Sequence, residues 1–228
     1  MDSWQELNHR IIACRLCPRL VAWREEIARV KKPAYADQAY WGKPLTGFGD
    51  PQAGLWVLGL APAAHGGNRT GRIFTGDRSG DWLFRALHRA GFANQPTSVS
   101  RDDGLQLQGA FISAAVRCAP PGNQPSPDER DRCFPYLQEE FAKLKRAKVL
   151  VALGGFAWQA ALRLLKSVGW ELRPRPAFGH AKEVRLGPCV LLGSFHPSQQ
   201  NTFTGKLTEA MLDAVFERAR SILQRGIE

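Results

Sequence analysis

The chain has 228 residues, of which 44% are hydrophobic and 23% charged, values typical of a globular protein long enough to enclose a sizeable core. No apolar run approaches the ~18 residues that cross a bilayer. Residues 1–6 also lack the basic and then apolar pattern of a signal peptide, so we expect a cytoplasmic protein with no membrane partner. The formal net charge of +10 favours a polyanionic partner such as nucleic acid, although a basic protein with a merely solvated surface fits the same number.

Apolar residues at helical spacing predict two helices at the start of the chain, within residues 1–32. These residues are Trp4, Leu7 and Ile11 in the first helix and Leu20, Trp23 and Ile27 in the second. Short apolar runs further along predict four strands that are buried on both faces. The runs lie near residues 55–60, 110–116, 149–153 and 190–192.

Helix signals lie between and after these strands. Ser79 is expected to cap one helix. Ser126, followed by Pro127 and Glu129, is a strong start for another, which Pro135 should kink. A further helix is expected around residues 157–165. The last helix places five apolar residues on one face, namely Leu207, Met211, Val215, Ala219 and Ile222.

Strands that alternate with helices favour a parallel sheet covered on both sides. We therefore predict a three-layer α/β/α fold with a central four-stranded parallel sheet. The sequence contains no internal repeat and no obvious linker, so a single domain over residues 1–228 is expected.

Two of the predicted strands end in loops that indicate a ligand site. The first loop, residues 59–66, is rich in small side chains and contains Gly59 and Ala61, whereas the second, residues 194–202, carries His196. In an open parallel sheet, ligands bind beyond the carboxyl ends of the strands. We expect the small-residue loop to form the floor of a pocket and the histidine loop its polar head.

The cysteines favour a metal centre over a disulfide. Cys14 and Cys17 form a CxxC outside any βαβ unit, which argues against a thioredoxin-like role. Cys118 follows a predicted strand and Cys133 lies on the next helix, so these residues could complete a four-thiolate site for zinc or an iron–sulfur cluster. In the alternative interpretation, Cys118 and Cys133 are ordinary buried residues. Cys189, inside an apolar strand, is expected to be inert.

Several motifs together resemble family 5 of the uracil-DNA glycosylases. Residues 59–77, GLAPAAHGGNRTGRIFTGD, resemble the first motif of that family, and residues 196–202, HPSQQNT, look like the second. The four cysteines match those that hold a 4Fe-4S cluster in families 4 and 5. Residues 40–50 and 117–123 are also similar. The resemblance covers most of the chain in the expected order, and it implies a structural 4Fe-4S cluster, with residues 1–32 supplying two of its cysteines.

The resemblance implies a monofunctional enzyme that flips a deaminated base out of DNA and hydrolyses its N-glycosidic bond, the first step of base excision repair. His196 would donate a hydrogen bond to the oxygen of the departing base, and Phe74 would stack on the base. Asp77 would stabilise positive charge on the sugar or position water, sharing this role with Asn123. In the alternative interpretation, Asp77 belongs to a turn or to the start of a helix.

Two departures from related families bear on activity and specificity. Leu60 stands where family 4 enzymes carry a glutamate, so another group must serve the sugar. Ala114 stands where glycosylases strict for uracil place an asparagine amide. We therefore expect a roomier pocket that admits hypoxanthine or xanthine as well as uracil.

The remaining candidates are contacts to substrate and to DNA. His65 and Asn68 are candidate substrate contacts, although small polar residues also commonly stitch such loops together. Ser198, Gln199, Gln200 and Asn201 lie where the superfamily presses a loop into the minor groove. The candidate phosphate contacts are Arg15, Arg19, Arg69, Arg72 and Arg117.

Two other functions remain open from the sequence. A damage-binding relative with lost or weak turnover would also fit Leu60 and Ala114. An iron–sulfur electron carrier would leave both motif loops and the positive charge unexplained. The expected partner is DNA that contains uracil or another deaminated base, bound by a monomer that associates with the nucleoid.

Overall fold

The computed structural model describes residues 3–225, so the first two and the last three residues of the predicted domain lie outside the description. Its centre is a six-stranded sheet in the order β1-β3-β2-β4-β6-β5. The strands are β1 (Phe48–Gly49), β2 (Leu55–Gly59), β3 (Ala110–Ala114), β4 (Val149–Leu153), β5 (Glu183–Leu186) and β6 (Cys189–Ser194). The four central strands are parallel, as predicted, whereas β1 and β5 are antiparallel edge strands that the sequence analysis missed.

Each edge strand is missed for a local reason. β1 has only two residues, too few for any periodicity. In β5, Val184 and Leu186 are buried while Arg185 is exposed, which is the alternation of a strand with one solvated face. A tight turn at Gly187, whose φ of 57° is left-handed, then returns the chain into β6.

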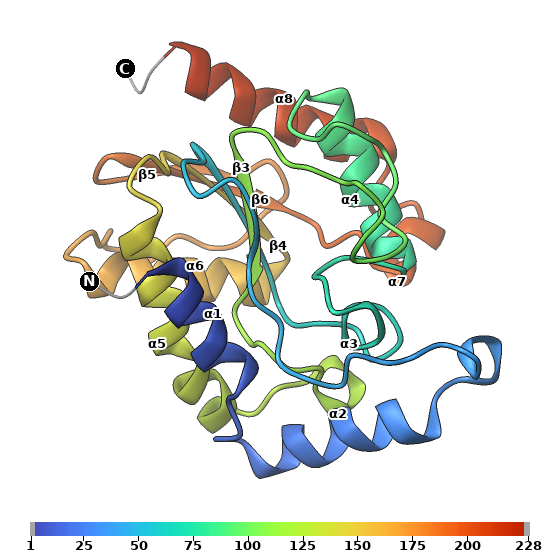
Figure 1. Cartoon of the computed structure of the whole chain (residues 1–228). Helices are drawn as coiled ribbons and strands as arrows, with labels where there is room; N and C mark the ends of the chain where they lie inside the picture. The colour runs from blue at the N-terminus through green and yellow to red at the C-terminus, as the bar shows by residue number, and fades with distance from the viewer. Residues whose placement is uncertain (1–2, 226–228) are drawn as a thin grey trace.

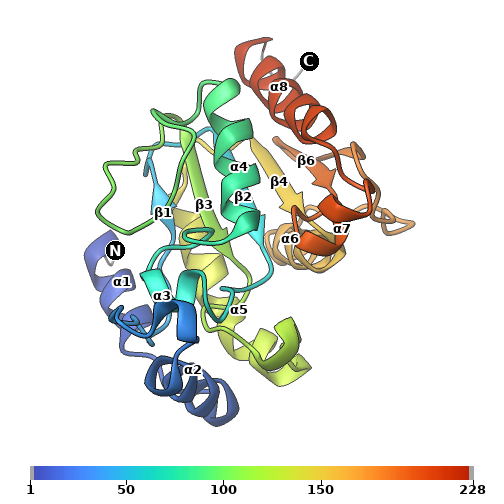
Figure 2. The ribbon, with the colours of Figure 1, turned by 90° about the vertical axis from the view of Figure 1, so that its right-hand side faces the viewer.

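The helices cover both faces of the sheet and form the predicted three layers (Figure 1). Leu55 and Val57 point to the face covered by α4 and α8, whereas Trp56 and Leu58 point to the face covered by α5 and α6. Figure 2 shows α4 and α8 in front of the parallel strands. The helices are α1 (Trp4–Ile12), α2 (Pro18–Val30), α3 (Gly67–Thr70), α4 (Arg78–Arg89), α5 (Pro127–Lys143), α6 (Gly155–Ser167), α7 (Gln199–Phe203) and α8 (Glu209–Arg225), with short 3₁₀ turns at Pro33–Tyr35 and Pro121–Asn123.

The helix starts test the capping predictions. Ser126 caps α5 through a complete capping box with Glu129, as predicted. The α5 helix continues through Pro135, so the kink at that residue stays a prediction. The prediction for α4 is wrong by two residues, because Asp77 and not Ser79 is the cap and its carboxylate accepts a hydrogen bond from the Gly80 N–H at 3.0 Å. Both residue types cap well, so the sequence alone does not separate them.

The two N-terminal helices are attached to α5 by ion pairs. Arg10 of α1 pairs with Glu139 of α5, and Arg19 of α2 pairs with Glu129 at 2.7 Å. Trp4 packs on Phe111 with 5.1 Å between the ring centroids. Among residues 3–225, no helix has both the length and the apolar character that a membrane span needs.

Candidate active site

The two motif loops meet at the carboxyl ends of the parallel strands. Gly59, the last residue of β2, pairs in register with Ala114, the last residue of β3. The pairing continues one step into the loops, because the Ala115 N–H donates to the Gly59 carbonyl at 3.0 Å. The predicted pocket floor therefore lies at the edge where ligands of open parallel sheets bind.

An aromatic side chain and a histidine face each other above this floor. The rings of Phe74 and His196 lie 5.8 Å apart between centroids, at an interplanar angle of 33°. Gly59 lies directly against Phe74, since a Cβ there would sit 2.8 Å from two carbons of the Phe74 ring. A side chain at position 59 would thus displace the ring, which explains the glycine at the end of β2.

The backbone of Phe74 has an unusual conformation. Its φ of 52° is left-handed, and its side chain is only 7% exposed. Large residues seldom adopt this conformation, which costs on the order of 1–3 kcal/mol and clusters at functional sites. The first turn of α4 accommodates it because Gly80 has no Cβ, which would lie 1.9 Å from the Phe74 carbonyl oxygen.

Asp77 caps α4 and also faces the first motif loop. A Cβ on Gly66 would lie 2.0 Å from Oδ2 of Asp77, so the carboxylate packs closely against that loop. Burial raises the pKa of the Asp77 carboxyl, and hydrogen bonds from the Gly80 and Ser79 backbone N–H groups oppose the rise. The structural interpretation of Asp77 as a helix cap is therefore correct, and its catalytic role stays a prediction.

His196 is held as a neutral imidazole. Burial lowers its pKa to about 4, because the charged form is disfavoured where water is excluded. The Asn201 side chain donates to the His196 carbonyl at 2.8 Å and closes the loop over α7. Ser198 caps α7 by accepting from the Asn201 N–H. Two of the four predicted DNA contacts thus also fix the histidine loop, whereas Gln199 and Gln200 are exposed.

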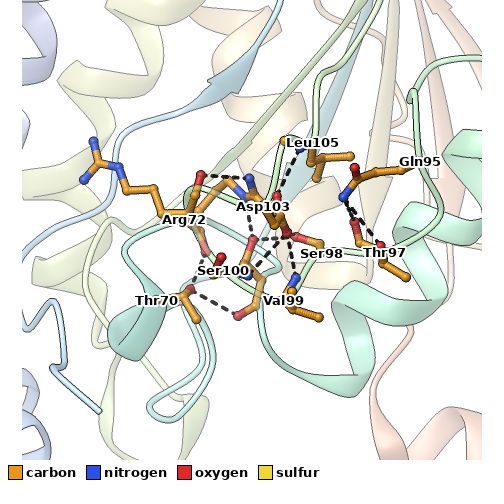
Figure 3. A network of polar contacts seen from close by, with 12 residues as sticks. Thr70, Arg72, Gln95, Thr97, Ser98, Val99, Ser100, Asp103 and Leu105 are labelled. Atoms are coloured by element: carbon orange, nitrogen blue, oxygen red, sulfur yellow. Dashed lines mark hydrogen bonds and ion pairs between the residues drawn. The ribbon is translucent and has the colours of Figure 1, made fainter.

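A buried polar network braces the segment that carries Phe74 and Asp77 (Figure 3). Arg72 forms an ion pair with Asp103 at 2.8 Å, with both side chains less than 10% exposed. Arg72 also donates to Thr75 at 2.9 Å and to Ser98 at 2.9 Å. Asp103 and Ser98 are not predictable from the sequence, because no local signal links them to a loop some 25 to 30 residues earlier.

Comparisons with known proteins agree with this geometry. Residues 46–220 match the model of the Uracil DNA glycosylase superfamily, a range that includes both motif loops. The chain belongs to this superfamily. It is 56% identical to a type-5 uracil-DNA glycosylase of Mycobacterium bovis, over 98% of this chain and 82% of that protein. It is 47% identical to a type-5 uracil-DNA glycosylase of Thermus thermophilus, over 93% and 94% of the two chains. A type-4 uracil-DNA glycosylase of Pyrobaculum aerophilum is 32% identical over 70% of this chain and 74% of that protein. These relatives confirm the predicted membership of family 5.

Not every predicted site residue of this superfamily member joins the pocket. The Asn68 side chain is 1% exposed and donates to the Arg24 carbonyl at 3.2 Å, so it ties the motif loop to α2. His65 shares a 3.0 Å hydrogen bond with Tyr40. Asn123 is exposed, and its side chain makes no hydrogen bond to the described residues. Ala61 is half-buried in the first motif loop. The substrate roles of these residues stay predictions.

Three of the five arginines proposed as phosphate contacts are buried and already partnered. Arg117 pairs with Glu140 at 2.6 Å, and neither side chain is more than 2% exposed. Arg72 is held in the network described above, and Arg69 donates to the His65 and Gly76 carbonyls. These predictions are wrong, because each guanidinium has a partner that the sequence does not reveal. Arg15 and Arg19 are exposed but paired with glutamates.

The four predicted ligand cysteines lie near one another at the N-terminal end of α2. Cys17, Cys118 and Cys133 are buried in one apolar cluster with Leu20. Burial raises the pKa of Cys118 to about 11 and that of Cys133 to about 12, and neighbouring cysteines add to both shifts; Cys14 contributes at Cys118. Within residues 3–225, no group of three or more His, Cys, Asp or Glu side chains is spaced to hold a single metal ion.

One side chain, Arg24, opposes the effect of burial and favours the thiolate form of Cys118. Arg24 is 2% exposed and its Nη1 donates to the Cys118 sulfur at 3.0 Å. Its Nε is buried without a hydrogen-bond partner among the described residues. A buried cation beside sulfur stabilises the deprotonated form that ligates iron. Four cysteines with an adjacent cation are the donor set that a group held by four thiolates would need.

Proposed function

We propose that this chain removes uracil, and also hypoxanthine and xanthine, from DNA by hydrolysing the N-glycosidic bond. Members of the superfamily are DNA glycosylases, which are hydrolases of N-glycosyl bonds, and the type-5 relatives are named for uracil. One observation carries the proposal, namely the Phe74–His196 pair above Gly59. A base that leaves the DNA stack needs a flat partner and a hydrogen-bond donor, and this pair supplies both.

The neutral state of His196 defines its role. With a pKa of about 4, the imidazole carries no charge at neutral pH, so it acts as a hydrogen-bond donor and not as an acid. A donor aimed at the base oxygen stabilises negative charge as the bond breaks. One such preorganised donor contributes on the order of 3–4 kcal/mol to a barrier of this kind.

Asp77 serves the other side of the breaking bond. Positive charge develops on the sugar as the base departs, and a carboxylate beside it stabilises that charge or orients the attacking water. Leu60 cannot take this role, although the corresponding family 4 residue is a glutamate. Asp77 is held against the first motif loop by its contact with Gly66 and by its hydrogen bond to Gly80, so it is already oriented before substrate binds.

Ala114 supports the broad specificity. It is buried at the end of β3 beside Gly59, and its methyl group has no hydrogen-bonding capacity. A pocket that lacks an amide at this position does not penalise a base whose polar edge differs from that of uracil. Purines with a deaminated edge are therefore admitted along with uracil.

The test uses duplexes that carry one uracil, one hypoxanthine or neither, followed by alkaline cleavage of abasic sites. We expect cutting at both lesions and none in the undamaged duplex. Ala114→Asn should lower hypoxanthine cutting at least tenfold relative to uracil, because the added amide reads a pyrimidine edge. Ala114→Leu, of similar shape without the amide, controls for size. Tight binding without cutting would instead identify a damage reader.

We further propose that Cys14, Cys17, Cys118 and Cys133 hold a 4Fe-4S cluster. Its contribution would be structural, because glycosidic hydrolysis transfers no net electrons. Cys14 and Cys17 lie between α1 and α2, Cys118 lies in the loop after β3, and Cys133 lies in α5, so their common ligation would join three separate segments. Arg24 would stabilise the Cys118 thiolate by the hydrogen bond described above.

A further inference from the structure

A concave site is lined by residues of α5 and α6. These two helices cover the face of the sheet opposite to α4 and α8 (Figure 1). The volume of the site is about 660 Å³. This value falls within the roughly 300–1,000 Å³ of pockets that enclose a ligand. Phe74, Asp77 and His196 do not line it, so the site is separate from the candidate active site.

The floor of this α5–α6 groove is apolar. Leu137, Leu162 and Leu186 lie in its wall and are each no more than 5% exposed. Leu172, also in the lining, is 41% exposed, so apolar surface continues to the mouth. A concave apolar floor of this kind is suited to a bulky apolar group inserted from outside.

The rim of the groove is cationic. Its charged lining consists of Arg130, Arg163, Lys166 and Arg175 against a single carboxylate, Glu171. Arg163 pairs with Asp131 and Lys166 with Glu171, but Arg130 and Arg175 make no ion pair with any residue between 3 and 225. Two guanidinium groups without counter-charges therefore flank an apolar floor, which calls for an anionic ligand.

The aromatic rings of the groove distinguish a peptide from a nucleic acid. The Arg163 guanidinium lies 4.1 Å from the centroid of Phe134, and the Arg130 guanidinium lies 5.8 Å from that of Phe156. Single-stranded nucleic acids bind through bases stacked on open aromatic faces. Arginines cover one face of Phe134 and of Phe156, and the third aromatic residue of the lining, Trp170, is in an edge-to-face contact with Phe141. The groove therefore offers apolar volume and carboxylate-binding forks instead of a row of open stacking faces.

We propose that the α5–α6 groove binds a segment of a partner protein in which a bulky apolar side chain is flanked by acidic residues. The apolar side chain occupies the floor, and the carboxylates pair with Arg130 and Arg175. Arginine forks at a rim around one buried anchor are typical of protein-binding hot spots.

The experiment measures the fluorescence anisotropy of a labelled peptide, a phenylalanine between two runs of three aspartates, titrated with the full chain. We expect saturable binding that weakens at least tenfold when the phenylalanine is replaced by alanine. The double variant Arg130→Glu/Arg175→Glu should weaken binding to the same degree or more. Neither arginine is in an ion pair with a described residue, so folding should be unchanged, and single-turnover excision at saturating enzyme should also be unchanged because neither residue belongs to the candidate active site. Arg146→Glu, an exposed residue outside the groove, is the matched control.

Three outcomes would overturn the proposal. The first is equal binding of the phenylalanine and alanine peptides, which means that charge alone is read. The second is a loss of binding in Arg146→Glu as large as in the double variant. The third is a labelled oligothymidylate that binds more tightly than the peptide and depends on Arg130 and Arg175, which would make the groove a nucleic-acid site.

Discussion

Phe74 and Asp77 illustrate how single residues serve the fold and the site together. The left-handed backbone of Phe74 turns its ring over Gly59, and three residues later Asp77 caps the helix that follows. Such strain persists only where the surroundings over-determine it. Here the buried contacts of Arg72 and Thr75 supply that restraint. The same contacts therefore restrain the segment that carries the proposed roles of Phe74 and Asp77.

Asp77→Asn separates the two roles of the aspartate. Asparagine caps helices as well as aspartate does, so the melting temperature should not fall by more than about 2 °C. The rate of uracil excision should fall by about 10²–10³, as when one preorganised electrostatic group is lost. Single-turnover excision and thermal unfolding of both proteins check these values. Unchanged excision would return Asp77 to a purely structural role.

The raised pKa of Asp77 predicts how the excision rates of the original protein and of Asp77→Asn depend on pH. Excision needs the carboxylate, so the rate should fall as the pH drops through a value above the ordinary ~3.9 of aspartate. Asp77→Asn should lose this limb, leaving only a decline near the pKa of about 4 of His196. Because ionised Asp77 is disfavoured in the folded state, the stability of Asp77→Asn relative to the original should rise with pH through the same window.

At the scale of elements, local signals were predictable and distant partners were not. The central strands and the Ser126 capping box are confirmed, because continuous apolar runs and Ser-Pro-x-Glu act within a few residues. The sequence predicts that Arg117 contacts phosphate, whereas in the structure Arg117 is buried in an ion pair with Glu140 of α5. No local pattern in the sequence indicates that pairing. The same holds for the candidate site. Its motif residues are predictable from the sequence, whereas Asp103, which pairs with Arg72, is not.

Cys133→Ser tests the proposed joining of α2, β3 and α5. Losing one thiolate should remove iron and acid-labile sulfide from the purified protein. It should also lower the melting temperature by roughly 5–10 °C, the shift that ~2–3 kcal/mol gives in a chain of this size. Cys189→Ser, a buried cysteine outside the four, should keep its iron. Full iron content in Cys133→Ser would contradict the proposed ligation.

For the whole molecule, the net charge of +10 must act through exposed cations, because Arg69, Arg72 and Arg117 are buried. Arg78 is exposed next to Asp77, and its guanidinium lies 4.3 Å from the centroid of Phe203, which is 67% exposed. Arg78 begins α4 and Phe203 ends α7, so the pair links the helix that Asp77 caps to the helix that follows His196. Arg78 is therefore the arginine that we expect to contact a DNA phosphate.

Arg78→Ala should weaken duplex binding about equally for all sequences. The slope of log affinity against log salt, about 0.9 for each phosphate contacted, should decrease by about 1. Arg146→Ala should leave the slope unchanged, because Arg146 precedes β4 at the opposite edge of the sheet. The measurement is the duplex affinity of the original protein and of both variants at several salt concentrations. Equal slopes for Arg78→Ala and the original would exclude this phosphate contact.

The attachment of α1 and α2 has a consequence for how the chain folds as it is made. Their ion pairs with α5 join residues 129 and 110 positions apart, so both helices leave the ribosome long before their partners are synthesised. Until then Leu7, Ile11 and Leu20, all fully buried in the finished protein, have no surface to cover them. The first helices to be translated are thus among the last to dock, and a ribosome stalled before Pro127 should display them in protease-sensitive form.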